Sequence, residues 1–144
     1  MIELNPILVV EDDPNDVELT LAAFEQHNLA NEVVIVHDGQ AALDYLIKQN
    51  VYATRTGGNP AVVLLDIKLP KIDGIQVLKT IRTTPGLKSV PVVMLTSSKE
   101  ELDVTRCYSL GVNAYVVKPV QFDDFLTAVG KAGMFWAAVN HPPP

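Results

Sequence analysis

Three consecutive carboxylates, Glu11, Asp12 and Asp13, follow directly on the apolar run ILVV. At about 4 Å, two like charges repel by about 4 kcal/mol even at an effective dielectric constant near 20. Such crowding is tolerable where the side chains splay into water or where a cation lies between them. A carboxylate after a strand is also often a helix N-cap, a role that suits Asp13. The acidic run therefore leaves both a cation site and a simple cap open.

Other polar residues follow further apolar runs. Asp66 follows VVLL, Thr96 follows VVML and Lys118 follows AYVV. Each alone has an ordinary explanation as a cap, a turn hydroxyl or a surface amine. Together they suit Mg²⁺ and a phosphoryl group, because Mg²⁺ takes oxygen ligands from one or two carboxylates and from phosphate. A carboxylate nucleophile can form an aspartyl-phosphate. We therefore predict phosphoryl transfer to Asp66, with Thr96 and Lys118 contacting the phosphoryl oxygens.

Five short apolar runs are predicted to be the strands that position these residues. They lack polar alternation, which is typical of parallel strands covered on both faces. These runs are 7–10, 33–36, 61–65, 90–95 and 114–117. Helical patterns separate them, beginning at Pro14 and continuing over 39–49, 74–82, 99–111 and from about 121. Five βα units in series predict an α/β doubly wound (βα)5 sandwich with a five-stranded parallel sheet. Ligands of such sheets bind at the carboxyl ends of the strands.

The rest of the chain completes one predicted domain over 1–144. Residues 50–60 are polar and turn-rich, so they predict an enlarged surface loop, and 139–144 predict a short tail. In the first helix, the apolar residues Val17, Leu21 and Phe24 are expected to form one stripe. Cys107 is expected to be a buried helical thiol.

Composition indicates which partners and which cellular compartment to expect. Eleven Lys and Arg against seventeen Asp and Glu give a net charge of −6, which argues against a nucleic-acid surface. No apolar run approaches the roughly 20 residues of a membrane helix, and the N-terminus lacks a signal-peptide pattern. The single cysteine fits a reducing compartment. We predict a cytoplasmic protein without a membrane or nucleic-acid partner.

The chain resembles a response regulator receiver domain from about Pro6 to Trp136. The resemblance rests on VVEDD, LLDIKLPKIDG, MLTSS and YVVKP, and on the 30 positions from Asp66 to Thr96 and 22 from Thr96 to Lys118. It implies a flavodoxin-like fold with strand order 2-1-3-4-5. It also implies a phosphoprotein of a two-component phosphorelay, which accepts a phosphoryl group from a histidine kinase. Its catalysis would be limited to its own phosphorylation and dephosphorylation, so it would not be an enzyme in the usual sense.

The resemblance implies roles for individual residues of the site. Asp66 would be the phosphoacceptor. Glu11, Asp12, Asp66 and the backbone carbonyl of Lys68 would hold Mg²⁺, Asp12 directly and Glu11 through water. The side chains of Lys68 and Ser98 would tune dephosphorylation.

The resemblance also implies a conformational switch. The Thr96 hydroxyl would move toward the phosphoryl group, and Tyr115 would turn inward behind it. The face made by residues 99–111, 114–117 and the helix from about 121 would then change. An ordinary half-buried strand aromatic remains the alternative for Tyr115.

A narrower resemblance concerns the single-domain regulators that partner bacterial and cyanobacterial phytochromes. It rests on the enlarged loop at 50–60 and on the terminal FWAAV, whereas YVVKPVQF is closer to the general receiver pattern. It implies a phytochrome-type histidine kinase as partner. Phe135 and Trp136 are expected to form a homodimer contact on the face made by residues 99–111, 114–117 and the helix from about 121. The alternative is that they pack the last helix against its own sheet.

Other functions of a strand-end aspartate remain alternatives. A haloacid-dehalogenase-type phosphatase also uses one, but it carries an acid/base Asp two positions later, where this chain has Lys68. A flavin or nucleotide carrier would need a Gly- or Ser/Thr-rich phosphate loop after the first strand, where this chain has carboxylates. A degenerate receiver that only binds a partner is the last alternative. It would not need the complete set of acidic residues together with Thr96 and Lys118, which argues against it.

Overall fold

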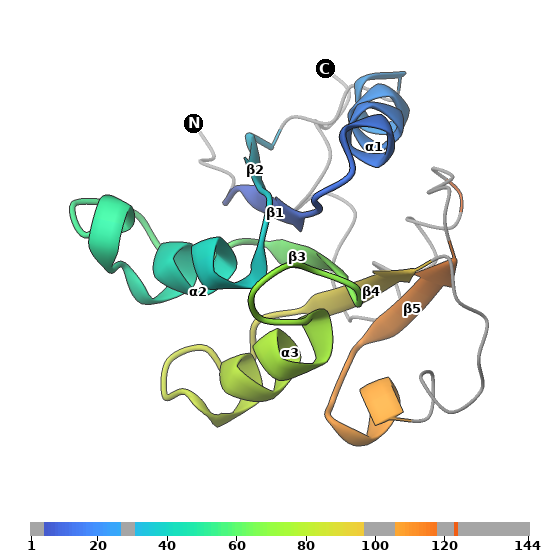
Figure 1. Cartoon of the computed structure of the whole chain (residues 1–144). Helices are drawn as coiled ribbons and strands as arrows, with labels where there is room; N and C mark the ends of the chain where they lie inside the picture. The colour runs from blue at the N-terminus through green and yellow to red at the C-terminus, as the bar shows by residue number, and fades with distance from the viewer. Residues whose placement is uncertain (1–4, 27–30, 97–105, 118–122, 124–144) are drawn as a thin grey trace, which may run out of the picture.

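One all-parallel sheet of five strands organises the molecule, in the order β2-β1-β3-β4-β5 (Figure 1). The computed structural model describes residues 5–26, 31–96, 106–117 and 123. The strands are β1 (Ile7–Val10), β2 (Val33–Val36), β3 (Val62–Asp66), β4 (Val92–Thr96) and β5 (Ala114–Val117). The predicted doubly wound, flavodoxin-like strand order is confirmed.

Helices cover both faces of the sheet. The named helices are α1 (Pro14–Gln26), α2 (Gly39–Ile47), α3 (Gly74–Thr83) and the 3₁₀ turn η1 (Asn50–Tyr52), and residues 106–109 are also helical. Figure 1 shows α2 and α3 together on one side of the sheet and α1 on the other. Because successive strand residues point to opposite faces, Leu8 and Val10 pack with α2 and α3, whereas Ile7 and Val9 pack with Phe24 of α1. This double coverage explains why the strands are apolar up to their last residues, Asp66 in β3 and Thr96 in β4.

Two strand boundaries differ from the prediction. Both β3 and β4 begin later and end one residue later than expected, so Asp66 and Thr96 are the last strand residues. At the start of β4, the Val90 N–H donates to the Leu87 carbonyl at 3.0 Å, and Pro91 has no N–H to give to the sheet. Those residues therefore form the preceding turn.

Helix α2 ends two residues earlier than predicted. Lys48 takes a left-handed conformation with φ 62°, and its N–H donates to the Asp44 carbonyl. The side chain of Asp44 accepts from the amide groups of Gln40, Gln49 and Asn50 at 2.9, 2.9 and 3.0 Å. These side-chain bonds, which lower the pKa of Asp44, hold the chain as it leaves the helix.

Helix α1 begins as predicted but turns a different stripe inward. Pro14 is its first residue, and the Asn15 N–H donates to Oδ1 of Asp13 at 2.9 Å, so Asp13 is the N-cap. Phe24 is 2% exposed and Thr20, one turn earlier, 4% exposed, whereas Leu21 is 36% exposed. Of the predicted apolar stripe, Phe24 is therefore buried and Leu21 is exposed, because the buried face continues from Phe24 through Thr20.

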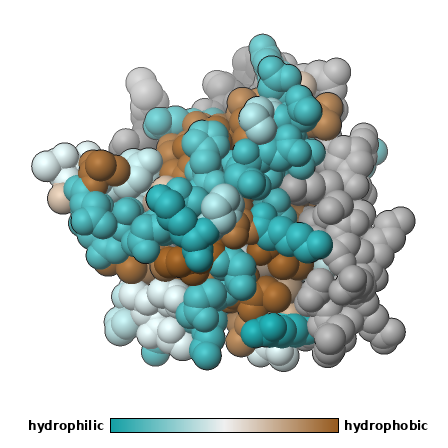
Figure 2. All heavy atoms as spheres, in the orientation of Figure 1, coloured by the Kyte–Doolittle hydropathy of each residue, from teal (hydrophilic) through white to brown (hydrophobic). Residues whose placement is uncertain are grey.

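Polar side chains cover most of one face of the described part of the molecule (Figure 2). Figure 2 shows hydrophilic residues over most of the viewed face, with apolar ones scattered among them. Cys107 is buried in the core, as predicted. Within the described part of the chain, no helix combines the length and apolar content needed to span a bilayer.

Candidate functional site

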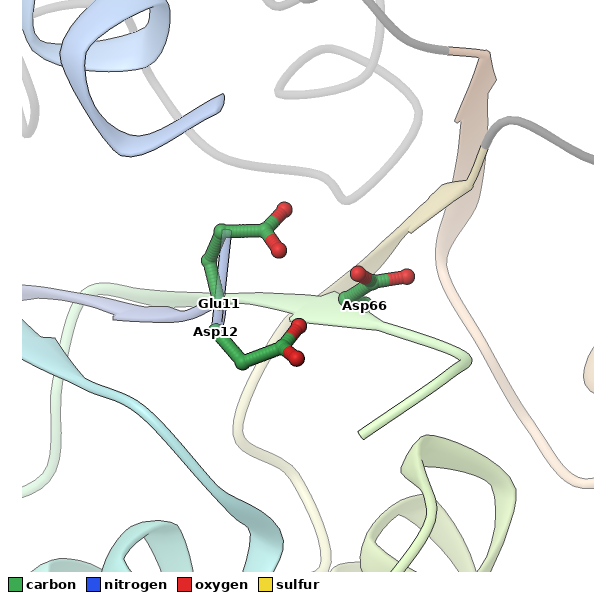
Figure 3. Close-up of side chains that lie close together, drawn as sticks. All are labelled: Glu11, Asp12 and Asp66. Atoms are coloured by element: carbon green, nitrogen blue, oxygen red, sulfur yellow. The ribbon is translucent and has the colours of Figure 1, made fainter. Parts of the chain in front are cut away.

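Three carboxylates meet at the carboxyl ends of β1 and β3. These strands pair in parallel, with Val10 opposite Leu65, so the turn after β1 lies beside the end of β3. One carboxylate oxygen from each of Glu11, Asp12 and Asp66 lies within 4.8 Å of the others. Figure 3 shows the Glu11 and Asp12 carboxyl groups turned toward the side on which Asp66 lies. We call these three residues the acidic cluster.

Burial makes the acidic cluster electrostatically unusual. Glu11 is 2% exposed and Asp66 is 6% exposed, whereas Asp12 is exposed to solvent. Like charges repel more strongly where little water screens them. A divalent cation between the carboxylates would relieve this repulsion, and an all-oxygen donor set fits Mg²⁺. The donor chemistry therefore suits the predicted metal.

Hydrogen bonds between backbone groups and side chains hold the acidic turn after β1. The Asp13 N–H donates to Oε2 of Glu11 at 3.1 Å, while the Asp13 side chain caps α1. On the other side, Nδ1 of His37 lies 3.1 Å from the backbone carbonyl oxygen of Glu11. The turn is therefore anchored to both α1 and the end of β2.

Asp66 is held from the loop that follows it. The Lys68 N–H donates to Oδ1 of Asp66 at 3.2 Å, and the Lys68 side chain is exposed. Gly74, the first residue of α3, packs directly on the Asp66 backbone, and a Cβ at this position would collide with the Asp66 carbonyl. The Gly74 N–H also donates to the Ile67 carbonyl at 2.8 Å. A glycine is therefore required where α3 approaches the acceptor.

Thr96 ends the neighbouring strand at the same edge of the sheet. Asp66 lies opposite Leu95 in the pairing of β3 and β4, and the Ile67 N–H donates to the Leu95 carbonyl at 3.3 Å. The backbone thus places Thr96 next to the end of the acceptor strand. Tyr115 lies in β5, half-buried against the core that α3 covers.

Several predicted residues lie outside the described part of the chain. These are Lys118, Ser98, Phe135, Trp136 and the tail at 139–144. Their predicted roles stay predictions.

A cavity of about 500 Å³ lies away from the acidic cluster. Its lining includes Asn5 and Pro6 before β1, Glu32 before β2, Tyr45 of α2 and Arg55 of the predicted loop. In a parallel sheet, the starts of the strands lie at the edge opposite to their carboxyl ends. The cavity and the acidic cluster are therefore separate features.

The sequence interpretation missed the segment that follows β2. His37 contacts the acidic turn, and Asp38 Oδ2 lies 3.5 Å from Nζ of Lys71 in the loop after Asp66. The rule that located Glu11 and Asp66, namely that function gathers where parallel strands end, also applies to His37. Applying it to the second strand would have found this residue.

Solved structures resemble the whole described fold. The structure of the bacteriophytochrome response regulator AtBRR is 58% identical to this chain, covers 97% of it and 100% of its own chain, and has a TM-score of 0.89. The structure of the phosphorylated cyanobacterial phytochrome response regulator RcpA is 37% identical, covers 89% of this chain and 91% of its own, and has a TM-score of 0.77.

A curated relative has similar coverage. The response regulator Rcp1 of Synechocystis sp. is 39% identical over 137 residues, which are 93% of this chain and 92% of Rcp1. The crystal structure of its Mn²⁺-bound form is 36% identical, covers 96% of this chain and 99% of its own, and has a TM-score of 0.77.

A family model supplies the assignment. Residues 7–130 match the model described as the response regulator receiver domain. The haloacid-dehalogenase-type phosphatase, the alternative drawn from the strand-end aspartate, receives no support from this match. The chain belongs to the response regulator receiver domain family.

Proposed function

We propose that this protein is a phosphorelay response regulator that accepts a phosphoryl group from a histidine kinase on Asp66. The observation that carries the proposal is the acidic cluster, with carboxylate oxygens of Glu11, Asp12 and Asp66 within 4.8 Å of one another at the carboxyl ends of two adjacent strands. Membership of the receiver family and the similarity to phosphorylated RcpA support it.

Mg²⁺ is the proposed cofactor. Glu11, Asp12 and Asp66 would hold it through carboxylate oxygens, together with the backbone carbonyl of Lys68. The ion would neutralise charge on the phosphoryl oxygens during transfer. The Mn²⁺-bound form of Rcp1 supports a divalent cation at such a cluster.

Asp66 is the proposed nucleophile. One of its carboxylate oxygens attacks the phosphorus of a phosphohistidine, a P–O bond forms as the P–N bond breaks, and the imidazole leaves with the bonding electron pair. The Lys68 N–H, 3.2 Å from Oδ1, restrains the carboxylate so that less freedom is lost on the way to the transition state. Later hydrolysis of the acyl phosphate would complete the cycle, so the protein catalyses only its own modification.

The response to phosphorylation is proposed to pass through the strands beside Asp66. Thr96 and Lys118 would contact the phosphoryl oxygens, and Tyr115 would follow Thr96 inward. Lys68 and Ser98 would set the lifetime of the phosphoryl group. The surface made by residues 99–111, β5 and the chain from about 121 would then change its affinity for a partner, including a second copy of this chain.

The cellular setting is also a proposal. Similarity to AtBRR, RcpA and Rcp1 supports a phytochrome-type histidine kinase as the phosphodonor. The net charge of −6 supports a protein partner in preference to nucleic acid. We propose a cytoplasmic, single receiver domain over residues 1–144.

Incubation with a small acyl phosphate and Mg²⁺ tests this function. Intact-mass spectrometry is expected to find the mass of one PO₃ group added to the wild-type protein and to Glu18→Gln, which removes an exposed carboxylate of α1. Asp66→Asn is expected to remain unmodified, because an amide is a poor nucleophile. An unmodified wild type, or a fully modified Asp66→Asn, would overturn the proposal.

A further inference from the structure

Residues 37–39 lead from β2 into the first residue of α2, and they contact both the turn that carries Glu11 and Asp12 and the loop that follows Asp66. His37 reaches the carbonyl of Glu11 with Nδ1 at 3.1 Å. Its neighbour Asp38 faces Lys71, in the loop after Asp66, at 3.5 Å. One short segment thus joins the acidic turn after β1 to the loop after β3.

The contact with the loop after β3 is close-packed. The Gly39 N–H points to the Pro70 carbonyl at 3.5 Å, and a Cβ on Gly39 would collide with the Ile72 carbonyl. Gly39 is also the first residue of α2, whose N-cap is Asp38. The segment therefore has little room to shift relative to the acceptor loop.

The contact with the acidic turn has a defined chemistry. A carbonyl oxygen can only accept, so the His37 ring must carry a proton on Nδ1. The carbonyl it contacts belongs to the peptide unit that leads from Glu11 into Asp12. The Glu11 carboxylate is held separately, by the Asp13 N–H at 3.1 Å. The His37 bond thus restrains the backbone from which the Asp12 side chain projects.

We propose that His37 is a positioning residue of the divalent-cation site. Its hydrogen bond orients the Glu11–Asp12 peptide, while Asp38 and Gly39 fix the same segment against the loop that follows Asp66. This inference rests on the proposed function, because it assigns a role at the proposed Mg²⁺ site. It predicts that His37 acts on metal affinity without contacting the metal.

An Mg²⁺ titration followed by NMR tests this role. The backbone N–H groups of Asp13 and Lys68 donate to two of the carboxylates, so their signals report binding. His37→Ala is expected to weaken Mg²⁺ binding about tenfold, the usual effect of losing a group that orients metal ligands. Thr83→Ala is the control, because it truncates an exposed side chain at the last residue of α3, and it is expected to leave the affinity close to wild type.

Rescue separates orientation from a general loss of structure. The Asn amide nitrogen and the His Nδ1 are both bonded to Cγ, so His37→Asn is expected to restore most of the affinity. His37→Gln carries its amide nitrogen one bond further out and is expected to bind like His37→Ala. Urea unfolding of each variant checks the fold.

The outcomes distinguish the two proposals. If the wild type shows no saturable Mg²⁺ response, the proposed function fails. If the wild type binds but His37→Ala binds equally well, or if Gln restores affinity as fully as Asn, the positioning role of His37 is overturned.

Discussion

At the scale of single residues, the crowding of buried carboxylates costs the fold stability. Glu11 and Asp66 are 2% and 6% exposed, and an oxygen of each lies within 4.8 Å of the other and of Asp12. Coulomb's law gives about 3 kcal/mol for two like charges about 5 Å apart at an effective dielectric constant near 20. This repulsion destabilises the metal-free fold and favours the binding of a cation between the carboxylates.

Asp66→Asn is therefore expected to stabilise the metal-free protein. The amide removes one charge, and its oxygen can still accept the Lys68 N–H. We expect the free energy of unfolding to rise by about 1–2 kcal/mol in urea titrations without divalent cations, less than the full Coulomb term because exposed Asp12 is screened. The gain is expected to shrink when Mg²⁺ is added. A metal-free Asp66→Asn protein no more stable than Glu18→Gln would contradict the repulsion.

Gly74→Ala tests the close approach of α3 to the acceptor. The new Cβ would collide with the Asp66 carbonyl, so backbone must shift, and we expect a loss of about 2–3 kcal/mol of unfolding free energy. Gly58→Ala is the control, because a Cβ there would meet no atom of the described residues within 4 Å. Its unfolding free energy is expected to change by less than about 1 kcal/mol. Equal effects of the two substitutions would refute the steric explanation.

The contacts of individual residues were only partly predictable from the sequence. Asp13 as N-cap followed from residue type and position, because capping is a local property. The contact of His37 with Glu11 joins residues 26 positions apart, so it depends on the pairing of β1 with β2. The need for glycine at position 74 could not be predicted either, because it arises from the close approach of α3 to the backbone of β3.

At the scale of elements, the end of α2 shows how side chains set a boundary. The Asp44 carboxylate accepts hydrogen bonds from the side-chain amides of Gln40, Gln49 and Asn50, which we call the amide cluster. These bonds lower the pKa of Asp44, and the bond from Gln40 has the largest effect. Apolar periodicity predicted α2 through residue 49, because periodicity contains no information on this amide cluster. By contrast, β1, β2 and β5 have their predicted bounds, since continuous apolar runs flanked by polar residues leave little choice.

The lowered pKa of Asp44 predicts a pH-dependent contribution to stability. The folded pKa lies below the ordinary value of 3.8, so the charged carboxylate stabilises the fold above pH 3.8. This contribution is lost as the pH falls through the lower, folded pKa. We expect the stability difference between wild type and Asp44→Asn in urea unfolding to shrink as the pH is lowered across 3.8. If the difference in unfolding free energy stayed constant over that range, the amide cluster would not stabilise the charged form of Asp44.

At the scale of the whole molecule, sheet topology creates the site. The order β2-β1-β3-β4-β5 brings the ends of β1 and β3 together although Asp12 and Asp66 are 54 positions apart in the chain. Parallel strands and right-handed connections made this edge predictable. The distances within the acidic cluster were not predictable, because they depend on the turns after each strand and on the His37 and Lys68 contacts.

Mapping the phosphoryl group is the most direct test of the central claim. Borohydride reduces an aspartyl-phosphate to homoserine, and peptide mass spectrometry then identifies the modified position. After incubation with Mg²⁺ and an acyl phosphate, we expect this conversion at Asp66 of the wild-type protein. Conversion at a different carboxylate, with Asp66 intact, would contradict the account.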